Sequence, residues 1–129
     1  MGRKKNSTHS KIKVKLQVGK EHSKRAKGHP RIIVEEEGDL RFGFGVSHSP
    51  QGREPLRKNP DPQDARDAYI NDEIEVAHKS NITMTNWTLH PEDEKSIKEK
   101  YPVLKEAQQE SIKKKKERAQ RERKRKKRK

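Results

Sequence analysis

The chain has 129 residues and a formal net charge of +14; 42% of its residues are charged and only 25% are hydrophobic. So polar a chain is not expected to order its whole length, because each ordered residue costs roughly 1–2 kcal/mol of backbone entropy. The absence of cysteine excludes disulfides, zinc–thiolate sites and thiol nucleophiles, and no apolar stretch approaches the roughly 18 residues of a membrane span.

Positive charge is concentrated at the two ends of the chain. Residues 1–28 contain ten Lys and Arg against one Glu, and residues 113–129 contain thirteen against two. The ends therefore carry +9 and +11, which leaves −6 on residues 29–112. Basic segments neutralise phosphates and release counterions, so the sequence predicts contact with a polyanion at the ends.

Two segments predict the first strands of a sheet. Residues 11–18 (KIKVKLQV) alternate apolar and polar side chains, which is typical of a half-buried strand. Residues 31–46 predict a hairpin with its turn at Gly38 and Asp39. The second strand of this hairpin carries a row of alternating apolar residues: Leu40, Phe42, Phe44 and Val46.

Two glycines, Gly43 and Gly45, fall on the opposite face of that second strand. Glycine weakens a strand, so its presence indicates a bulge or the close approach of another backbone or a ligand. The two glycines do not complete a dinucleotide-binding fingerprint, because His48 stands where the third glycine belongs.

A long loop and a further strand follow the hairpin. Residues 47–70 contain proline and turn residues, and residues 81–89 predict a strand with a bulge near Asn86. Trp87 in this strand and Tyr69 in the loop could stack on bases. A lone tryptophan in so thin a core is more often buried, and we favour burial.

The C-terminal third predicts two helices. His90 is the expected N-cap of the first, and Pro91 fits its first turn. Pro102 is expected to interrupt this helix. Residues 103 to about 123 predict a second helix with too few apolar residues for a core-facing stripe, so we expect it to project into solvent.

This order of elements predicts a mainly β fold with a C-terminal helix. The expected architecture is a small SH3-like antiparallel barrel with basic disordered or helical tails. The expected organisation is a basic disordered N-terminus (1–10), a small β-rich domain with its closing helix (11–101) and a basic helical or disordered tail (102–129).

The segment from Ser47 to Ser49 does not predict a serine-nucleophile site, because neighbouring residues of a strand point to opposite faces. RNA cleavage needs no protein nucleophile, since the 2′-hydroxyl attacks, but it needs an acid or base and a cation. His48 and Arg53 lie on one loop and are the candidate catalytic pair of a metal-independent endoribonuclease. No residue spacing predicts a metal site, and no motif predicts a cofactor.

Three segments together resemble a known group of proteins: GHPRIIVEEEGDLRFGFGVSHSP, LRKNPDPQDARDAYI and WTLHPEDEKSIKE. The group comprises small uncharacterised proteins of bacterial plasmids, phages and integrative elements. It has a remote likeness to the PemK/MazF-type toxin barrel, whose members cleave or bind RNA. The resemblance covers residues 28 to about 100. The matching positions are His29, Pro30, Ser47, His48, Lys58, Asn59 and Tyr69. Ser47 replaces the usual threonine of the group, and His90 the usual serine.

We therefore expect a nucleic-acid-binding accessory protein of a bacterial mobile element or phage, located in the cytoplasm of a bacterial host, with RNA favoured over DNA. The alternatives are a PemK/MazF-like endoribonuclease toxin and a phage-encoded inhibitor that binds a host protein. No membrane partner is expected. The residues expected to contact nucleic acid are all basic: Lys11, Lys13, Lys15, Arg57, Lys58, Lys113, Lys114, Arg121, Arg123 and Arg125.

Overall fold

A computed structural model describes residues 15–22 and 29–128, with side chains described as far as Arg121. In chain order its elements are β1 (Gln17–Glu21), β2 (His29–Glu37), β3 (Leu40–Gly45), β4 (Glu54–Pro55), β5 (Tyr69–Ile70), β6 (Glu75–His78), the 3-10 helix η1 (Lys79–Asn81), β7 (Ile82–Met84), α2 (Pro91–Ala107) and α3 (Gln109–Arg128).

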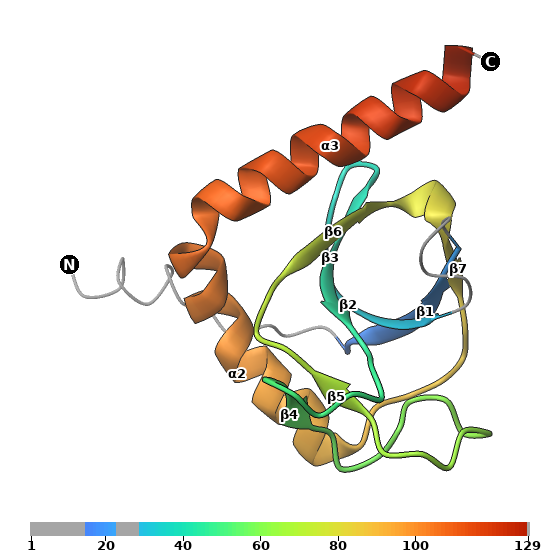
Figure 1. The fold of residues 1–129 in the computed structure, drawn as a ribbon, viewed down its shortest axis with the longest axis vertical. Helices are drawn as coiled ribbons and strands as arrows, with labels where there is room; N and C mark the ends of the chain where they lie inside the picture. The colour runs from blue at the N-terminus through green and yellow to red at the C-terminus, as the bar shows by residue number, and fades with distance from the viewer. Residues whose placement is uncertain (1–14, 23–28, 129) are drawn as a thin grey trace.

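Five strands form one antiparallel sheet in the order β6-β3-β2-β1-β7. Its two edge strands, β6 and β7, follow each other in the chain through the single turn of η1, and the sheet curls round into a half-barrel (Figure 1). The short strands β4 and β5 pair separately. The predicted mainly β class, a small antiparallel barrel-like domain with a C-terminal helix, is confirmed, with two helices after the sheet.

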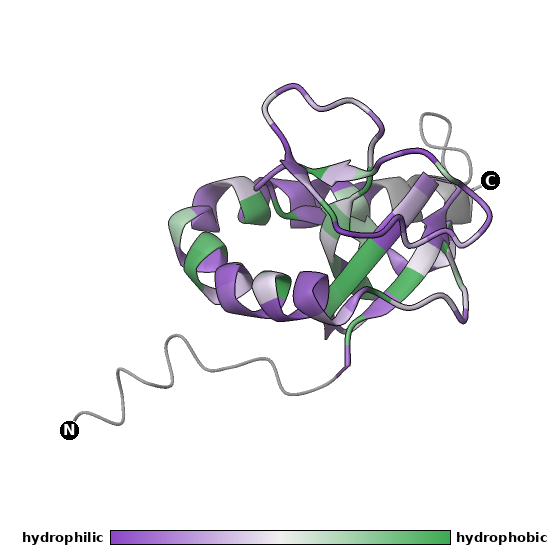
Figure 2. Cartoon of the chain, turned by 90° about the horizontal axis from the view of Figure 1, so that it is seen from below, coloured by the Kyte–Doolittle hydropathy of each residue, from purple (hydrophilic) through white to green (hydrophobic). Residues whose placement is uncertain are grey.

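The central hairpin agrees with the prediction. β2 and β3 pair around Gly38, whose φ of 58° suits glycine at a tight turn. The alternating row of β3 enters the core: Leu40, Phe42, Phe44 and Val46 are all at most 5% exposed. Hydrophobic residues lie in the strands at the centre of the molecule, and the loops around them are hydrophilic (Figure 2).

The outer strands differ from the prediction. β1 begins at Gln17, and residues 11–14 of the expected strand lie outside the described residues. The strand expected over 81–89 is only three residues long, because 79–81 form η1 and the chain leaves the sheet after Met84. β6 has no counterpart in the sequence prediction, since its four residues show no clear alternation of apolar and polar side chains.

The close approach of the β2 backbone to β3 requires a glycine at position 43. A Cβ at this position would lie 1.7 Å from the carbonyl oxygen of Ile32 on the neighbouring strand. The register of β2 on β3 shifts between Ile33 and Glu35, beside the residue that pairs with Gly43. Gly45 differs, because a Cβ there would meet nothing within 4 Å. The expected close approach of another backbone is therefore confirmed for Gly43, and no part of the described chain makes such an approach at Gly45.

The face of β2 opposite to Ile32 carries a buried charge. Arg31 is 8% exposed, donates a hydrogen bond to Glu21, and pairs in register with Gly45. Its Nε and Nη1 have no hydrogen-bond partner among the described residues. Burial raises the pKa of the nearby Glu75, against the opposing effects of Lys115 and Arg31. The ion pair of Arg31 and Glu21 on this face of the sheet is thus largely withdrawn from water.

Helix α2 begins as predicted, with the His90 side chain accepting a hydrogen bond from the backbone N–H of Glu92. Pro102 does not end it, because the helix continues to Ala107. The break comes at Gln108, whose side-chain amide accepts from the N–H of Ile74 (3.0 Å) and donates to the carbonyl of Asp72 (2.6 Å). These two hydrogen bonds tie the corner between the helices to the segment before β6.

Helix α3 does not simply project into solvent, which corrects the prediction. It crosses the tip of the β2–β3 hairpin (Figure 1) and packs against β6. Ile112 and Ala119 are 6% and 7% exposed and belong to the core cluster. Their spacing of seven residues puts both on one face of the helix. Two apolar contacts were too few to stand out in so basic a segment.

The two glycines of β3 give a matched test of the packing. Gly43→Ala should lower the free energy of unfolding by about 2–3 kcal/mol, because the new methyl group overlaps a strand backbone that cannot move away freely. Gly45→Ala should leave it unchanged or raise it by up to about 1 kcal/mol, since it removes the entropic penalty of glycine without a clash. Denaturant unfolding of both variants checks this. Equal destabilisation would contradict the structural difference.

Candidate nucleic-acid interface

The inward face of α3 is attached to the acidic body, residues 29–112, by ion pairs. Lys115 is paired with Glu73 (2.8 Å) and lies 3.7 Å from Glu75, and it donates to the carbonyl of Ile74 (2.7 Å). Its side chain is only 13% exposed. One helical step further, Lys116 is 2.7 Å from Glu37 and 6.0 Å from the ring centre of Phe42. The side chains of these two lysines therefore hold α3 against the acidic body.

The outward face of α3 carries cations of a different kind. Lys114, Arg118 and Arg121 are exposed and follow each other at intervals of four and three residues, so they form one row along the helix. We call these three residues the outward stripe. None of them forms an ion pair or hydrogen bond within the part of the chain whose side chains are described. Lys113 lies beside the stripe and lines a shallow hollow together with Lys116, Glu117, Gln120 and Arg121.

The structure describes the side chains of only some of the residues predicted to contact nucleic acid in α3. Lys113, Lys114 and Arg121 are exposed on α3. Arg123 and Arg125 belong to α3, but their side chains lie beyond the described ones. Arg118 was not among the predicted residues. Its position four residues after Lys114 and three before Arg121 is the helical spacing that could have identified it.

The predicted N-terminal contact residues are described only in part. Lys11 and Lys13 lie outside the described residues, whereas Lys15 is exposed just before β1. The next lysine along the chain, Lys20, lies over the ring of Trp87, 5.1 Å from its centre. Trp87 itself is half-buried against the core, which fits the preference for burial over stacking on bases.

A second basic group lies at the other end of α2. Arg57 and Lys58 are exposed, and the buried carboxylate of Asp93 accepts hydrogen bonds from both backbone N–H groups, at 2.9–3.0 Å from Arg57 and 3.3 Å from Lys58. Asp93 is in the first turn of α2, and Gln108 follows its last residue. At 1.5 Å per residue these positions are about 22 Å apart. The predicted residues therefore form two separate groups.

The candidate catalytic residues lie on the loop after β3. The His48 ring contacts two acceptors: the backbone carbonyl of Asp67 at Nδ1 (3.2 Å) and the Asp64 carboxylate at Nε2 (3.2 Å). Both contacts are hydrogen bonds only when both ring nitrogens carry protons. Arg53 donates to the backbone carbonyls of Ser49 and Gln51 and does not bond to His48 within this described loop. Both side chains are thus engaged in holding the loop.

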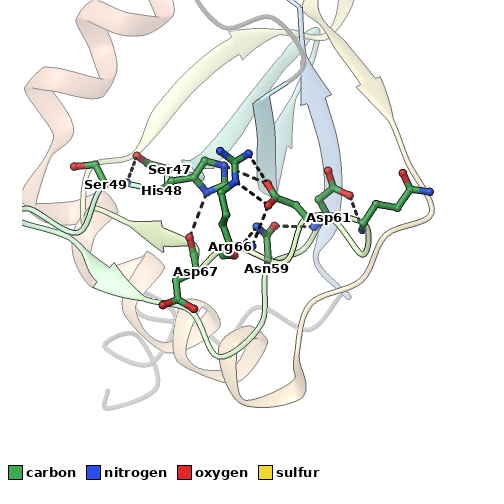
Figure 3. Close-up of polar contacts among 9 residues, drawn as sticks. Ser47, His48, Ser49, Asn59, Asp61, Arg66 and Asp67 are labelled. Atoms are coloured by element: carbon green, nitrogen blue, oxygen red, sulfur yellow. Dashed lines mark hydrogen bonds and ion pairs between the residues drawn. The ribbon is translucent and has the colours of Figure 1, made fainter.

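Ser47 also has a local structural role. Its backbone pairs with Tyr69 through two hydrogen bonds, of 2.9 and 2.7 Å, and its hydroxyl accepts from the N–H of Ser49. The predicted divergence of Ser47 and His48 fits this arrangement. The serine faces its own turn, and the histidine faces the loop of residues 59–67 (Figure 3).

Asp64 organises that loop electrostatically. The Arg66 guanidinium forms a two-point contact with its carboxylate, Nε to Oδ1 at 3.0 Å and Nη2 to Oδ2 at 3.1 Å, and the backbone N–H of Arg66 adds a third hydrogen bond. The Arg66 and His48 side chains both approach the Asp64 carboxylate. Chiefly through the hydrogen bonds from Arg66, the pKa of Asp64 falls from 3.8 to about 2.

This pKa shift predicts how the loop responds to acid. Because the pKa of Asp64 is lowered, its contribution to stability is fully present above pH 3.8 and is lost as the pH falls through about 2. Arg66→Ala should return the pKa of Asp64 towards 3.8, whereas His48→Ala should change it much less, because His48 contributes least among the causes. Carbon-13 NMR titration of the Asp64 carboxyl measures both. A larger effect of the His48 variant would show that the histidine dominates the contact.

Comparison with protein-family models, with curated proteins and with solved structures finds no match to this chain. The resemblance to proteins of mobile elements and to the PemK/MazF-type barrel therefore stays a prediction. Within the described part of the chain, no group of three metal-ligating side chains is suitably arranged for an ion. In that same part, none of the helices combines the length and the apolar character that crossing a membrane demands.

Proposed function

We propose that this chain is a nucleic-acid-binding accessory protein whose phosphate contacts come chiefly from the outward stripe of α3. The observation that carries the proposal is the division of the lysines and arginines on this helix. Lys115 and Lys116 are paired with carboxylates of the acidic body, whereas the outward stripe is exposed. If the cations of α3 served only to attach the helix to the acidic body, the exposed cations of the outward stripe would not be needed.

The two ends of the chain support the same function. Phosphate contacts through basic side chains give affinity without sequence preference. Lys15 is exposed before β1, and the sequence continues the basic pattern of α3 through Arg123 and Arg125. Arg57 and Lys58 provide a second, smaller contact at the far end of α2. The sequence resemblance favours RNA over DNA and the cytoplasm of a bacterial host.

The geometry of the loop after β3 favours binding over catalysis. A general base needs a nitrogen able to accept a proton from the substrate, but both nitrogens of His48 face acceptors of the protein. Arg53 is directed at carbonyls of its own turn. An endoribonuclease mechanism would require both side chains to leave these contacts first.

Removal of the outward stripe tests the proposal. The variant Lys114→Gln/Arg118→Gln/Arg121→Gln should bind RNA and DNA about tenfold or more weakly near physiological salt. The slope of log affinity against log salt should fall by about two to three, since each phosphate contact contributes roughly 0.7–0.9. Fluorescence anisotropy across a salt series measures both quantities.

A matched control removes the same charge elsewhere. Lys79→Gln/Lys95→Gln/Lys98→Gln deletes three cations from η1 and the N-terminal half of α2, and the surface ion pairs that it breaks contribute little to stability. This variant should keep nearly the affinity and salt slope of the unaltered chain. If both triple variants lose binding equally, net charge and not the outward stripe causes the binding, and the proposal is wrong.

A further inference from the structure

All aromatic side chains of this protein are withdrawn from solvent to some degree. The five Phe, Tyr and Trp residues all lie in the described part of the chain, so the ends contribute none. Phe42, Phe44 and Tyr101 are at most 2% exposed. Tyr69 and Trp87 are half-buried, and the Lys20 ammonium lies over the Trp87 ring. None of the five rings is therefore fully open to an unpaired base: three are buried, and Tyr69 and Trp87 are partly covered.

Stacking on aromatic rings is what most single-strand binders combine with positive charge. Without such rings, a protein holds nucleic acid by its phosphates, and the strength of this contact depends on the density of phosphate charge. Duplex DNA carries one charge per roughly 1.7 Å of its axis, and each neutralised phosphate releases more counterion from a duplex than from a single strand. The lack of a fully exposed aromatic ring and the presence of exposed cations on α3 thus favour a duplex.

The geometry of α3 points the same way. Its 20 residues extend for about 30 Å, and Ile112 and Lys115 fix one face of it to the sheet. The outward stripe is therefore a row of cations about 10 Å long on one side of a helix whose opposite side is packed on the sheet. A duplex presents its phosphates in an equally regular array, whereas a single strand must lose conformational freedom to match a fixed row.

We infer that the outward stripe of α3 binds the phosphate backbone of double-stranded nucleic acid in preference to single strands. The inference rests on the proposed function and narrows its ligand to the double helix. Duplex DNA and duplex RNA share this chemistry, and separate arms of the experiment distinguish them.

The test compares four probes with the full chain at near-physiological salt: a 20-nucleotide single strand and a 20-base-pair duplex, each as DNA and as RNA. Anisotropy should show at least one duplex bound about tenfold or more tightly than its single strand. The fluorescence of Trp87, the one tryptophan of the chain, should not be quenched by duplex binding. The outward-stripe variant defined above should bring the ratio of duplex to single-strand affinity close to one.

The outcomes separate this inference from the proposed function. Single strands bound as tightly as duplexes would overturn the duplex preference and leave nucleic-acid binding in place. Quenching of Trp87 by bound single strands would contradict the argument that no aromatic ring of this protein stacks on bases. Absence of binding by all four probes would overturn both. A preferred duplex whose selectivity survives in the outward-stripe variant would also contradict the inference, because the preference would then come from another surface.

Discussion

The contact of Lys115 with the acidic body helps to fix which basic side chains of α3 face solvent. Its ammonium reaches two carboxylates and a backbone carbonyl, and little of it is exposed. A charge-assisted contact of this kind is stronger than an ordinary surface ion pair. The apolar contribution of α3 is small, with Ile112 and Ala119 in the core cluster. The rotation of the helix about its axis therefore depends on these charged contacts as well as on the two apolar ones.

The same principle extends along α2. Tyr101 donates a hydrogen bond to Glu35 (2.7 Å), and Lys105 contacts both oxygens of that carboxylate at 2.9 and 3.0 Å. Burial and the neighbouring Glu35 raise the pKa of the Tyr101 hydroxyl, so it stays protonated and donates throughout the physiological range. Gln108 then fixes the corner before α3. Carboxylates of the acidic body, Glu35 at α2 and Glu37 and Glu73 at α3, thus help to orient the two helices.

Local signals account for what the sequence predicted correctly. The alternating row ending at Val46 and the turn at Gly38 need no distant partner to be recognised, and neither does the cap at His90. The failures depend on tertiary contacts. β6 pairs with the edge of β3, and α2 continues through Pro102 with the neighbouring Tyr101 buried in the core. Glutamine is a good helix former, so the break between α2 and α3 at Gln108 could not be predicted from the sequence.

The candidate interface shows the same limit. Composition indicated that the C-terminal segment contacts a polyanion, and helical spacing relates Lys114 to Arg121. The sequence could not show that Lys115 and Lys116, in the same run of four lysines, face the opposite way. That assignment needed Glu73 and Glu37, which are distant in the chain. Net charge thus overstates the number of cations available to a ligand.

This division of charge also separates ligand binding from the attachment of α3. Salt screens exposed charges over about 10 Å at 0.1 M, but screens buried pairs much less. The outward stripe is exposed, whereas the side chain of Lys115 is 13% exposed. Rising salt should therefore release a polyanion from the stripe well before it detaches α3 from the sheet. The helix would persist as a preformed surface, so its ordering need not be repeated at each binding event.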